Sequence, residues 1–148
     1  MIRKKQDMIK PRVALGDYRS GTRLLIYAWV LPTSAFALPL VFLNHLACGQ
    51  SFRVSGVLEV KGPLVRWFLS RSIVSAAALT LGHVVLYADE EARQRFRSHE
   101  LVHVLQAEMW GPLFLPTYLI LALISWHRTG SGYWNHPWEV EAREKAGI

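Results

Sequence analysis

The residues most able to do chemistry form the segment His99-Glu100-Leu101-Val102-His103. In a helix, side chains four residues apart lie on the same face, so His99 and His103 would present their rings together. Zinc accepts neutral imidazole nitrogens at about 2.0–2.1 Å, and this spacing supplies two of them. Glu100 would be rotated by about 100° from His99, where its carboxylate reaches a water on the metal and not the metal itself. The segment therefore predicts a Zn²⁺ site with Glu100 as general base.

A catalytic zinc usually has three protein ligands and one open position, so a third ligand is expected elsewhere in the chain. The residues that follow the motif offer four candidates, and spacing alone leaves the choice open: His136, Glu139, Glu141 and Glu144.

Three other polar residues have positions that suit a supporting role. Gln106 lies one turn further along the His99 and His103 face, where it would hydrogen-bond a ligand histidine or the loop, or pack between helices. His83 precedes the motif helix and would stabilise an oxyanion or bond a carboxylate, with a purely structural histidine as the alternative. Tyr133 would offer a phenol to a tetrahedral intermediate, with an ordinary loop tyrosine as the alternative.

The elements that must position these residues indicate an α+β fold. Asp89 followed by Glu90 and Glu91 is typical of a helix start, and Gly111-Pro112 ends the predicted motif helix near Trp110. Alternating or β-branched residues predict strands at 52–61 and 78–87, with a short amphipathic helix at 64–71 between them. After the motif helix we expect an apolar helix at 113–126, a loop at 128–136 and a last helix at 137–146 that begins at Pro137.

The charge distribution predicts a membrane anchor at the N-terminus. The chain carries a net charge of +6, and residues 1–23 hold seven Lys or Arg against two Asp. Residues 24–47 contain no Asp, Glu, Lys or Arg, and a helix of this length would rise about 36 Å, enough for a hydrocarbon core of about 30 Å. Basic residues before an apolar segment are typical of a cytoplasmic N-terminus in the bacterial inner membrane.

These features divide the chain into a basic segment 1–23, a transmembrane anchor 24–47 and a metal-binding domain 48–148. A signal peptide or a lipoprotein site ending at Cys48 fits the N-terminus less well. The run 72–88 is a weaker candidate for a second span. One span would place the metal site outside the cytoplasm, whereas two would return it to the cytoplasm.

Composition also limits the partners. A single cysteine, Cys48, excludes an intrachain disulfide. The basic excess lies before the apolar run and no basic-aromatic patch follows, so nucleic acid is not an expected partner. The expected partners are a lipid membrane and a peptide or protein substrate. The chain is short for a substrate cleft, so a partner chain or a second copy would complete the cleft.

The segment Asn135-His136-Pro137-Trp138-Glu139-Val140-Glu141-Ala142 resembles the Glu-x-x-Ala segment of gluzincin metallopeptidases, especially the membrane-embedded CAAX prenyl protease family. The resemblance implies a zincin-like domain in which Glu139, three residues before Ala142, is the third zinc ligand. Where that family has an Asp directly after the Ala, this chain has Arg143, so the role of orienting a ligand histidine has no assigned residue.

A second resemblance covers about residues 53–145 and is to a group of small bacterial membrane-associated proteins. Its motifs here are Thr80–His83, His99–Gln106, Gly111–Pro116 and Asn135–Ala142. This resemblance implies kinship with that group, but it does not imply a substrate or an activity.

Three hypotheses follow. The first is a membrane-anchored zinc metallopeptidase, and the second is a zinc hydrolase that acts on a non-peptide bond at the membrane. The third is a catalytically inactive membrane protein, with an assembly or packing role, that retains the site. Glu100 favours an enzyme because zinc binding alone does not require it, whereas Arg143 and the short chain favour the inactive protein.

Overall fold

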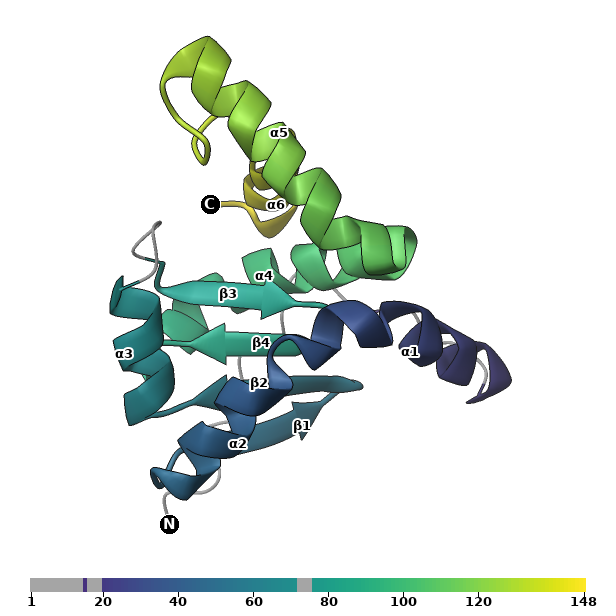
Figure 1. Ribbon diagram of the computed structural model, residues 1–148, viewed down its shortest axis with the longest axis vertical. Coiled ribbons are helices and arrows are strands. Elements are labelled where there is room, and N and C mark those ends of the chain that lie inside the picture. Colours follow the sequence, from purple (N-terminus) through teal and green to yellow (C-terminus); the bar gives the residue numbers. More distant parts are fainter. Residues whose placement is uncertain (1–14, 16–19, 72–75) are drawn as a thin grey trace.

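The computed structural model describes residues 15, 20–71 and 76–148 and has an α+β fold (Figure 1). Four strands form one sheet in the order β1-β2-β4-β3: β1 (Gln50–Val54), β2 (Val57–Lys61), β3 (Ala78–Leu81) and β4 (Val84–Tyr87). β1 and β3 pair antiparallel with their neighbours, and β2 pairs parallel with β4 in the centre. The edge strands are therefore β1 and β3.

Helices cover both faces of the sheet. α2 (Leu38–Leu46) and α3 (Pro63–Arg71) pack on the face that carries Val60, Val84 and Leu86, and in Figure 1 α2 lies in front of the sheet. The motif helix, α4 (Glu90–Trp110), covers the opposite face, where Val57, Val85 and Tyr87 meet its residues Leu101 and Val104. This core fixes α4 against the sheet along the turns that carry the motif.

Each of the two predicted strands is in fact a β-hairpin. Residues 52–61 were expected to form one strand, but Ser55 and Gly56 adopt positive φ angles of 51° and 87° and reverse the chain between β1 and β2. Gly82, with φ 64°, does the same with His83 between β3 and β4. The hairpin over 78–87 also shows that this part of the weaker second-span candidate, 72–88, is sheet; residues 72–75 lie outside the described residues.

The apolar segment 24–47 forms two helices instead of the expected single one. α1 (Ser20–Ala35) and α2 are bent by 69° relative to each other. Pro32 is accommodated inside α1, whereas the break falls just before Pro39, which occupies the first turn of α2, where its missing N–H is tolerated. Of the basic segment 1–23, residues 1–14 and 16–19 lie outside the described residues, and residues 20–23 form the first turn of α1.

After α4 the chain continues through the 3₁₀ turn η1 (Gly111–Leu113) into α5 (Phe114–Thr129), then through a loop into α6 (Pro137–Ala146). The boundaries predicted for the motif helix and the last helix are confirmed, and α5 extends the predicted apolar helix by a few residues. The helical run Glu90–Thr129 is long and apolar enough to cross a membrane by length and composition, and little of its apolar part is buried. Because charged residues fill the first half of α4, the apolar part is 109–126, which has no Asp, Glu, Lys or Arg.

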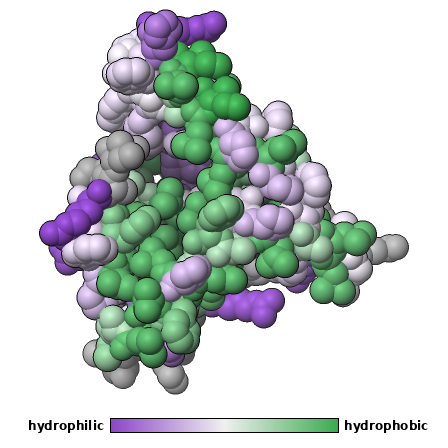
Figure 2. All heavy atoms as spheres, in the orientation of Figure 1, coloured by the Kyte–Doolittle hydropathy of each residue, from purple (hydrophilic) through white to green (hydrophobic). Residues whose placement is uncertain are grey.

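Large apolar side chains are exposed on α1, α2 and α5 and at the short segments that adjoin these helices. Figure 2 shows them as a hydrophobic surface that extends over the front of the molecule and along α5. We call this set the apolar face; its residues are Leu24, Leu25, Trp29, Leu31, Phe36, Leu38, Phe42, Leu43, Leu46, Leu113, Leu119, Ile120, Leu123, Ile124 and Trp126. A face of this extent is typical of contact with a membrane or another protein.

Candidate metal centre

The motif lies in the middle of α4, where the buried part of the helix begins. The Asp89 carboxylate accepts a hydrogen bond of 2.8 Å from the Ala92 N–H and caps the helix, and Glu90 and Glu91 complement its dipole. Three turns later, His99 and His103 point to α6. Both side chains are almost fully buried, with exposed fractions of 3 % and 4 %.

Three side chains converge between α4 and α6. His99 Nε2 lies 3.0 Å from Glu139 Oε2, His103 Nε2 lies 3.2 Å from Glu139 Oε1, and the two Nε2 atoms are 3.2 Å apart. Ligands at about 2.0–2.1 Å from a tetrahedral zinc would be roughly 3.3–3.4 Å from one another, so these separations are close to those that a bound ion requires. His99, His103 and Glu139 therefore form a buried cluster that could hold a metal ion.

Gln106 determines which nitrogen of His103 carries a proton. The Gln106 amide nitrogen donates to the Trp138 carbonyl at 3.3 Å and to Glu141 Oε2 at 2.8 Å, so its side-chain oxygen faces His103. That oxygen lies 2.8 Å from His103 Nδ1, which must therefore donate. The Nε2 atom of a neutral His103 then presents a lone pair to Glu139.

A lone pair on His103 Nε2 that faces a carboxylate oxygen and a second ring nitrogen is repulsive unless a cation lies between them. A proton or a metal ion satisfies this need. The Nδ1 atom of His99 is buried and has no hydrogen-bond partner in the described part of the chain, so the two histidines are held differently. The donor set, two imidazoles and one carboxylate, suits zinc and related divalent metals.

Glu139 is held as a carboxylate. Burial alone would raise its pKa, but hydrogen bonds with His103 and His99 outweigh burial and lower the pKa well below its usual range. The Tyr118 hydroxyl of α5 also donates to Glu139 Oε1 at 2.5 Å. An ionised carboxylate in this position is the form that binds a metal.

Glu100 lies on the side of α4 that faces the sheet. Its Oε2 atom accepts a hydrogen bond of 2.6 Å from the Thr80 hydroxyl on edge strand β3, and Thr80 also reaches the Glu100 backbone carbonyl at 3.3 Å. Only 5 % of Glu100 is exposed. The carboxylate is thus positioned by the sheet and does not belong to the three-residue cluster.

The structure separates Glu139 from the other candidates for the third ligand. Glu141 accepts hydrogen bonds from Lys145 and Gln106, and Glu144 is exposed. The His136 Nδ1 atom accepts from the Trp138 N–H at the start of α6, and its Nε2 donates to the Tyr118 carbonyl at 3.0 Å. Burial lowers the pKa of His136, which favours the neutral ring that this arrangement needs.

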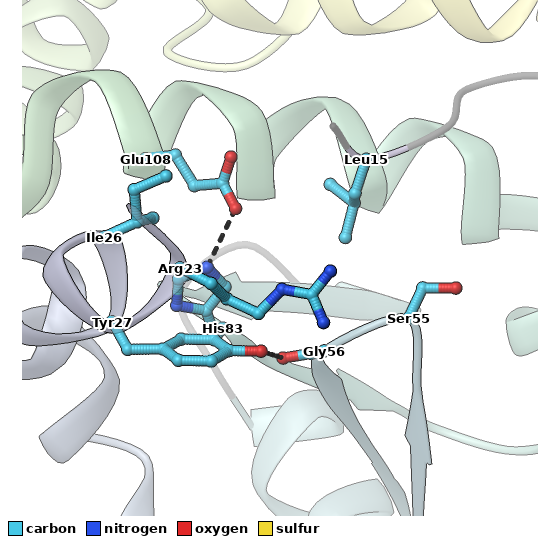
Figure 3. Close-up of a pocket in the computed structure, with 8 residues that line it drawn as sticks. All are labelled: Leu15, Arg23, Ile26, Tyr27, Ser55, Gly56, His83 and Glu108. Carbon is cyan, nitrogen blue, oxygen red and sulfur yellow. Dashed lines mark hydrogen bonds and ion pairs between the residues drawn. The ribbon is translucent and has the colours of Figure 1, made fainter. Parts of the chain in front are cut away.

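His83 is positioned by a different set of partners. Its Nε2 atom lies 3.0 Å from Glu108 Oε1, and its ring packs edge-on against Tyr27 (Figure 3). A small cavity of about 20 Å³ lies beside this pair, with Arg23 on its wall. The structure thus brings His83 to α1 and the end of α4. Tyr133, in the loop before α6, packs on its neighbour Trp134 and on Arg143 of α6.

Thr80 and Tyr118 were not predicted as site residues. Each contacts a site carboxylate from an element that is distant in the sequence, and neither side chain belongs to a metal-ligand or catalytic spacing pattern. Comparison of the chain with protein-family models, with curated proteins and with solved structures finds no match. The resemblances drawn from the sequence therefore stay predictions.

Proposed function

We propose that this protein is a membrane-associated, zinc-dependent hydrolase, most simply a metallopeptidase. The observation that carries the proposal is the convergence of His99 Nε2, His103 Nε2 and the Glu139 carboxylate within about one ligand-to-ligand distance of each other, with Glu100 beside them on α4. A zincin-like domain of the gluzincin type is the arrangement we infer for α4 and α6.

In this proposal each side chain has a separate task. His99, His103 and Glu139 hold the ion, which would act as a Lewis acid and make water a stronger nucleophile. Glu100 accepts a proton from the attacking water and returns it to the leaving amine. Thr80 fixes one oxygen of Glu100 and leaves the other oxygen to handle the proton. Gln106 keeps the proton of His103 on Nδ1, so Nε2 stays available.

The apolar face supports a membrane location, and the seven basic residues within 1–23 support a cytoplasmic N-terminus at a bacterial inner membrane. A substrate at or near the membrane surface is consistent with this location. A peptide bond is favoured by the resemblance to gluzincins, and a non-peptide bond would use the same groups.

One observation favours a second candidate, a non-catalytic membrane protein with a structural metal site. The exposed fractions of His99, Glu100, His103 and Glu139 lie between 3 % and 5 %, so a substrate reaches them only if neighbouring side chains or α6 move. A buried, closed site suits a metal that stabilises the packing of α4 on α6.

A set of variants separates the two candidates. Purified protein in detergent is analysed for metal content and for hydrolysis of a mixed peptide library. For a hydrolase, Glu100→Gln stays folded and metal-loaded but loses about 10²–10⁴-fold in rate, because it loses proton transfer. His103→Ala loses metal and activity together. Exposed residues on α4 and α5 give the matched controls Glu91→Gln and His127→Ala, which change neither property.

Metal in the wild type with no difference in turnover between wild type and Glu100→Gln would leave only the structural site. Wild-type protein that binds no metal would overturn both candidates.

A further inference from the structure

The apolar helices α1 and α2 are each hydrogen-bonded to the sheet, and these attachments limit how the chain can lie in a membrane. Tyr27, in the second turn of α1, donates its hydroxyl to the Gly56 carbonyl at 3.0 Å. Asn44, near the end of α2, donates to the Lys61 carbonyl at 3.2 Å and accepts from the Val65 N–H at 3.3 Å. The middle of α1 and the end of α2 are therefore attached close to the two ends of one strand, β2.

The length of β2 excludes a membrane crossing between these attachments. Gly56 and Lys61 are five residues apart, about 17 Å in an extended strand, whereas a hydrocarbon core is about 30 Å thick. A straight helix would place Tyr27 and Asn44 about 26 Å apart, and the bend of 69° shortens this distance. Crossing would also carry β2 into the membrane together with the buried Glu59, which pairs with Arg93 and Arg97.

The helices and the sheet are in close contact at these attachments, so the α1–α2 pair cannot move away from the sheet without breaking this packing. A Cβ atom at Gly56 would collide with the Tyr27 hydroxyl, and one at Gly62 would collide with the Asn44 side chain. Between them, Thr33 donates to the Gly111 carbonyl at 2.8 Å and Ser34 accepts from the His83 N–H at 3.0 Å. From Tyr27 to Asn44 the α1–α2 pair is thus part of the folded domain.

α5 is attached to the rest of the domain in a similar way. From Tyr118 to Thr129 the helix rises about 16 Å, and the following loop brings His136 back to hydrogen-bond the Tyr118 carbonyl at 3.0 Å. One face of α5 packs inward through Phe114, Tyr118 and Ser125, while its exposed leucines and isoleucines lie on the opposite face. A helix with this division suits a position in the plane of the membrane interface.

We propose that the chain does not cross the membrane but inserts α1, α2 and α5 into one leaflet from one side, so that the N-terminal segment, the sheet and the metal centre all lie on that side. The occupant of the apolar face is a lipid bilayer. The net charge of +5 over residues 1–23, which end in the first turn of α1, is complementary to anionic headgroups, and Arg128 is exposed at the end of α5. Because the positive segment favours the cytoplasmic side, the metal centre faces the cytoplasm.

The single native cysteine gives a direct test. Cys48 is exposed just after α2 and lies in the sequence between the α1–α2 pair and α5. Two further reporters are made in a Cys48→Ser background: Ser20→Cys, at the start of α1, and Glu144→Cys, in α6; both positions are exposed. Each full-length protein is expressed in bacteria and treated with a membrane-impermeant maleimide in inside-out and in right-side-out vesicles.

We expect all three cysteines to react in inside-out vesicles and to be protected in right-side-out vesicles until detergent is added. Labelling of Ser20→Cys and Cys48 from opposite sides would show that α1–α2 crosses the membrane and would overturn the proposal, as would opposite labelling of Cys48 and Glu144→Cys for α5. Wild-type protein that fails to float with vesicles of anionic lipid, and is instead soluble as a dimer, would assign the apolar face to a second copy. None of these outcomes depends on metal binding or turnover.

Discussion

The Nδ1 atom of His103 and the side-chain oxygen of Gln106 are 2.8 Å apart, one turn from each other on α4. Because the Gln106 amide nitrogen is already engaged by the Trp138 carbonyl and Glu141 on α6, this contact fixes the histidine tautomer. Gln106 thereby links the orientation of one proposed metal ligand to the docking of the helix that carries another, Glu139. A partner of this kind supports metal affinity without touching the ion.

We expect Gln106→Met to weaken metal binding by about 10- to 100-fold while the protein stays folded. Methionine is similar in length but neither accepts from Nδ1 nor donates to α6. Competition with a chelator of known affinity measures the change. The exposed Gln94 on the same helix gives the control Gln94→Met, which should match wild type. Equal affinities for wild type and Gln106→Met would show that the tautomer of His103 does not depend on this contact.

Glu139 and Glu141 are two residues apart on α6, but in the proposed site only Glu139 is a metal ligand. Glu139 contacts both histidines and is 3 % exposed, whereas Glu141 pairs with Lys145 near the surface. We expect Glu139→Gln to lose bound metal, because an amide is a poor ligand and leaves the imidazoles without a countercharge, and Glu141→Gln to retain it. Metal analysis of the two purified variants decides the assignment. Loss of metal in Glu141→Gln alone would transfer the ligand role to Glu141.

The sequence could predict the helices that carry the site, but not how they pack on each other. The cap at Asp89, the stop at Gly111 and the start at Pro137 are local signals, so the boundaries of α4 and α6 could be predicted correctly. Once these two helices are set, the four-residue spacing puts His99 and His103 on one face. Glu139 could be ranked above its neighbours only through the resemblance to gluzincins, because spacing alone does not say how α6 packs on α4.

The errors in the predicted fold come from turns inside apolar patterns. A single alternating strand through Ser55-Gly56 would put Phe52 and Leu58 on the same face of the sheet. The observed register instead pairs Phe52 with Glu59 and puts these two residues on the face toward α4. A two-residue turn reverses the chain without interrupting the hydrophobic pattern. The break between α1 and α2 was missed for a similar reason: composition is continuous across it, and the bend depends on contacts of Ser34 and Asn44 with distant backbone groups.

Thr80 links edge strand β3 to the proposed general base. Its hydroxyl donates to Glu100 Oε2 at 2.6 Å. Thr80→Val preserves the shape but leaves a buried carboxylate oxygen without this donor, so we expect a loss of about 1–3 kcal/mol in the free energy of unfolding with metal content unchanged. Urea unfolding in mild detergent, together with metal analysis, measures both.

Thr80→Ser retains the hydroxyl and should restore most of the stability lost in Thr80→Val. For a hydrolase, Thr80→Val should also lower kcat more than it changes KM, because a displaced base affects the chemical step. Stability and turnover that are identical in wild type and Thr80→Val would show that Glu100 does not depend on the sheet for its position.

Asn44 joins α2 to the folded domain by hydrogen bonds, in addition to the apolar packing of that helix on the sheet. It is fully buried, and its side chain bonds two backbone groups, the Lys61 carbonyl and the Val65 N–H, at the junction of β2 and α3. Asn44→Ala removes both partners at once. Because buried backbone groups without partners are costly, we expect a loss of about 1–3 kcal/mol in the free energy of unfolding, measured by urea unfolding in mild detergent.

The exposed Asn135 gives the matched control, since Asn135→Ala removes an amide of the same size from the loop before α6 and should leave stability near that of wild type. The same reasoning applies to removal of residues 1–47. A detachable anchor would leave a folded, soluble remainder, whereas the attachments at Tyr27, Thr33 and Asn44 predict a remainder that does not fold. Limited proteolysis distinguishes the two results. If the shortened chain is soluble, protease-resistant and still binds metal, then α1 and α2 are an independent anchor and the domain begins after Cys48.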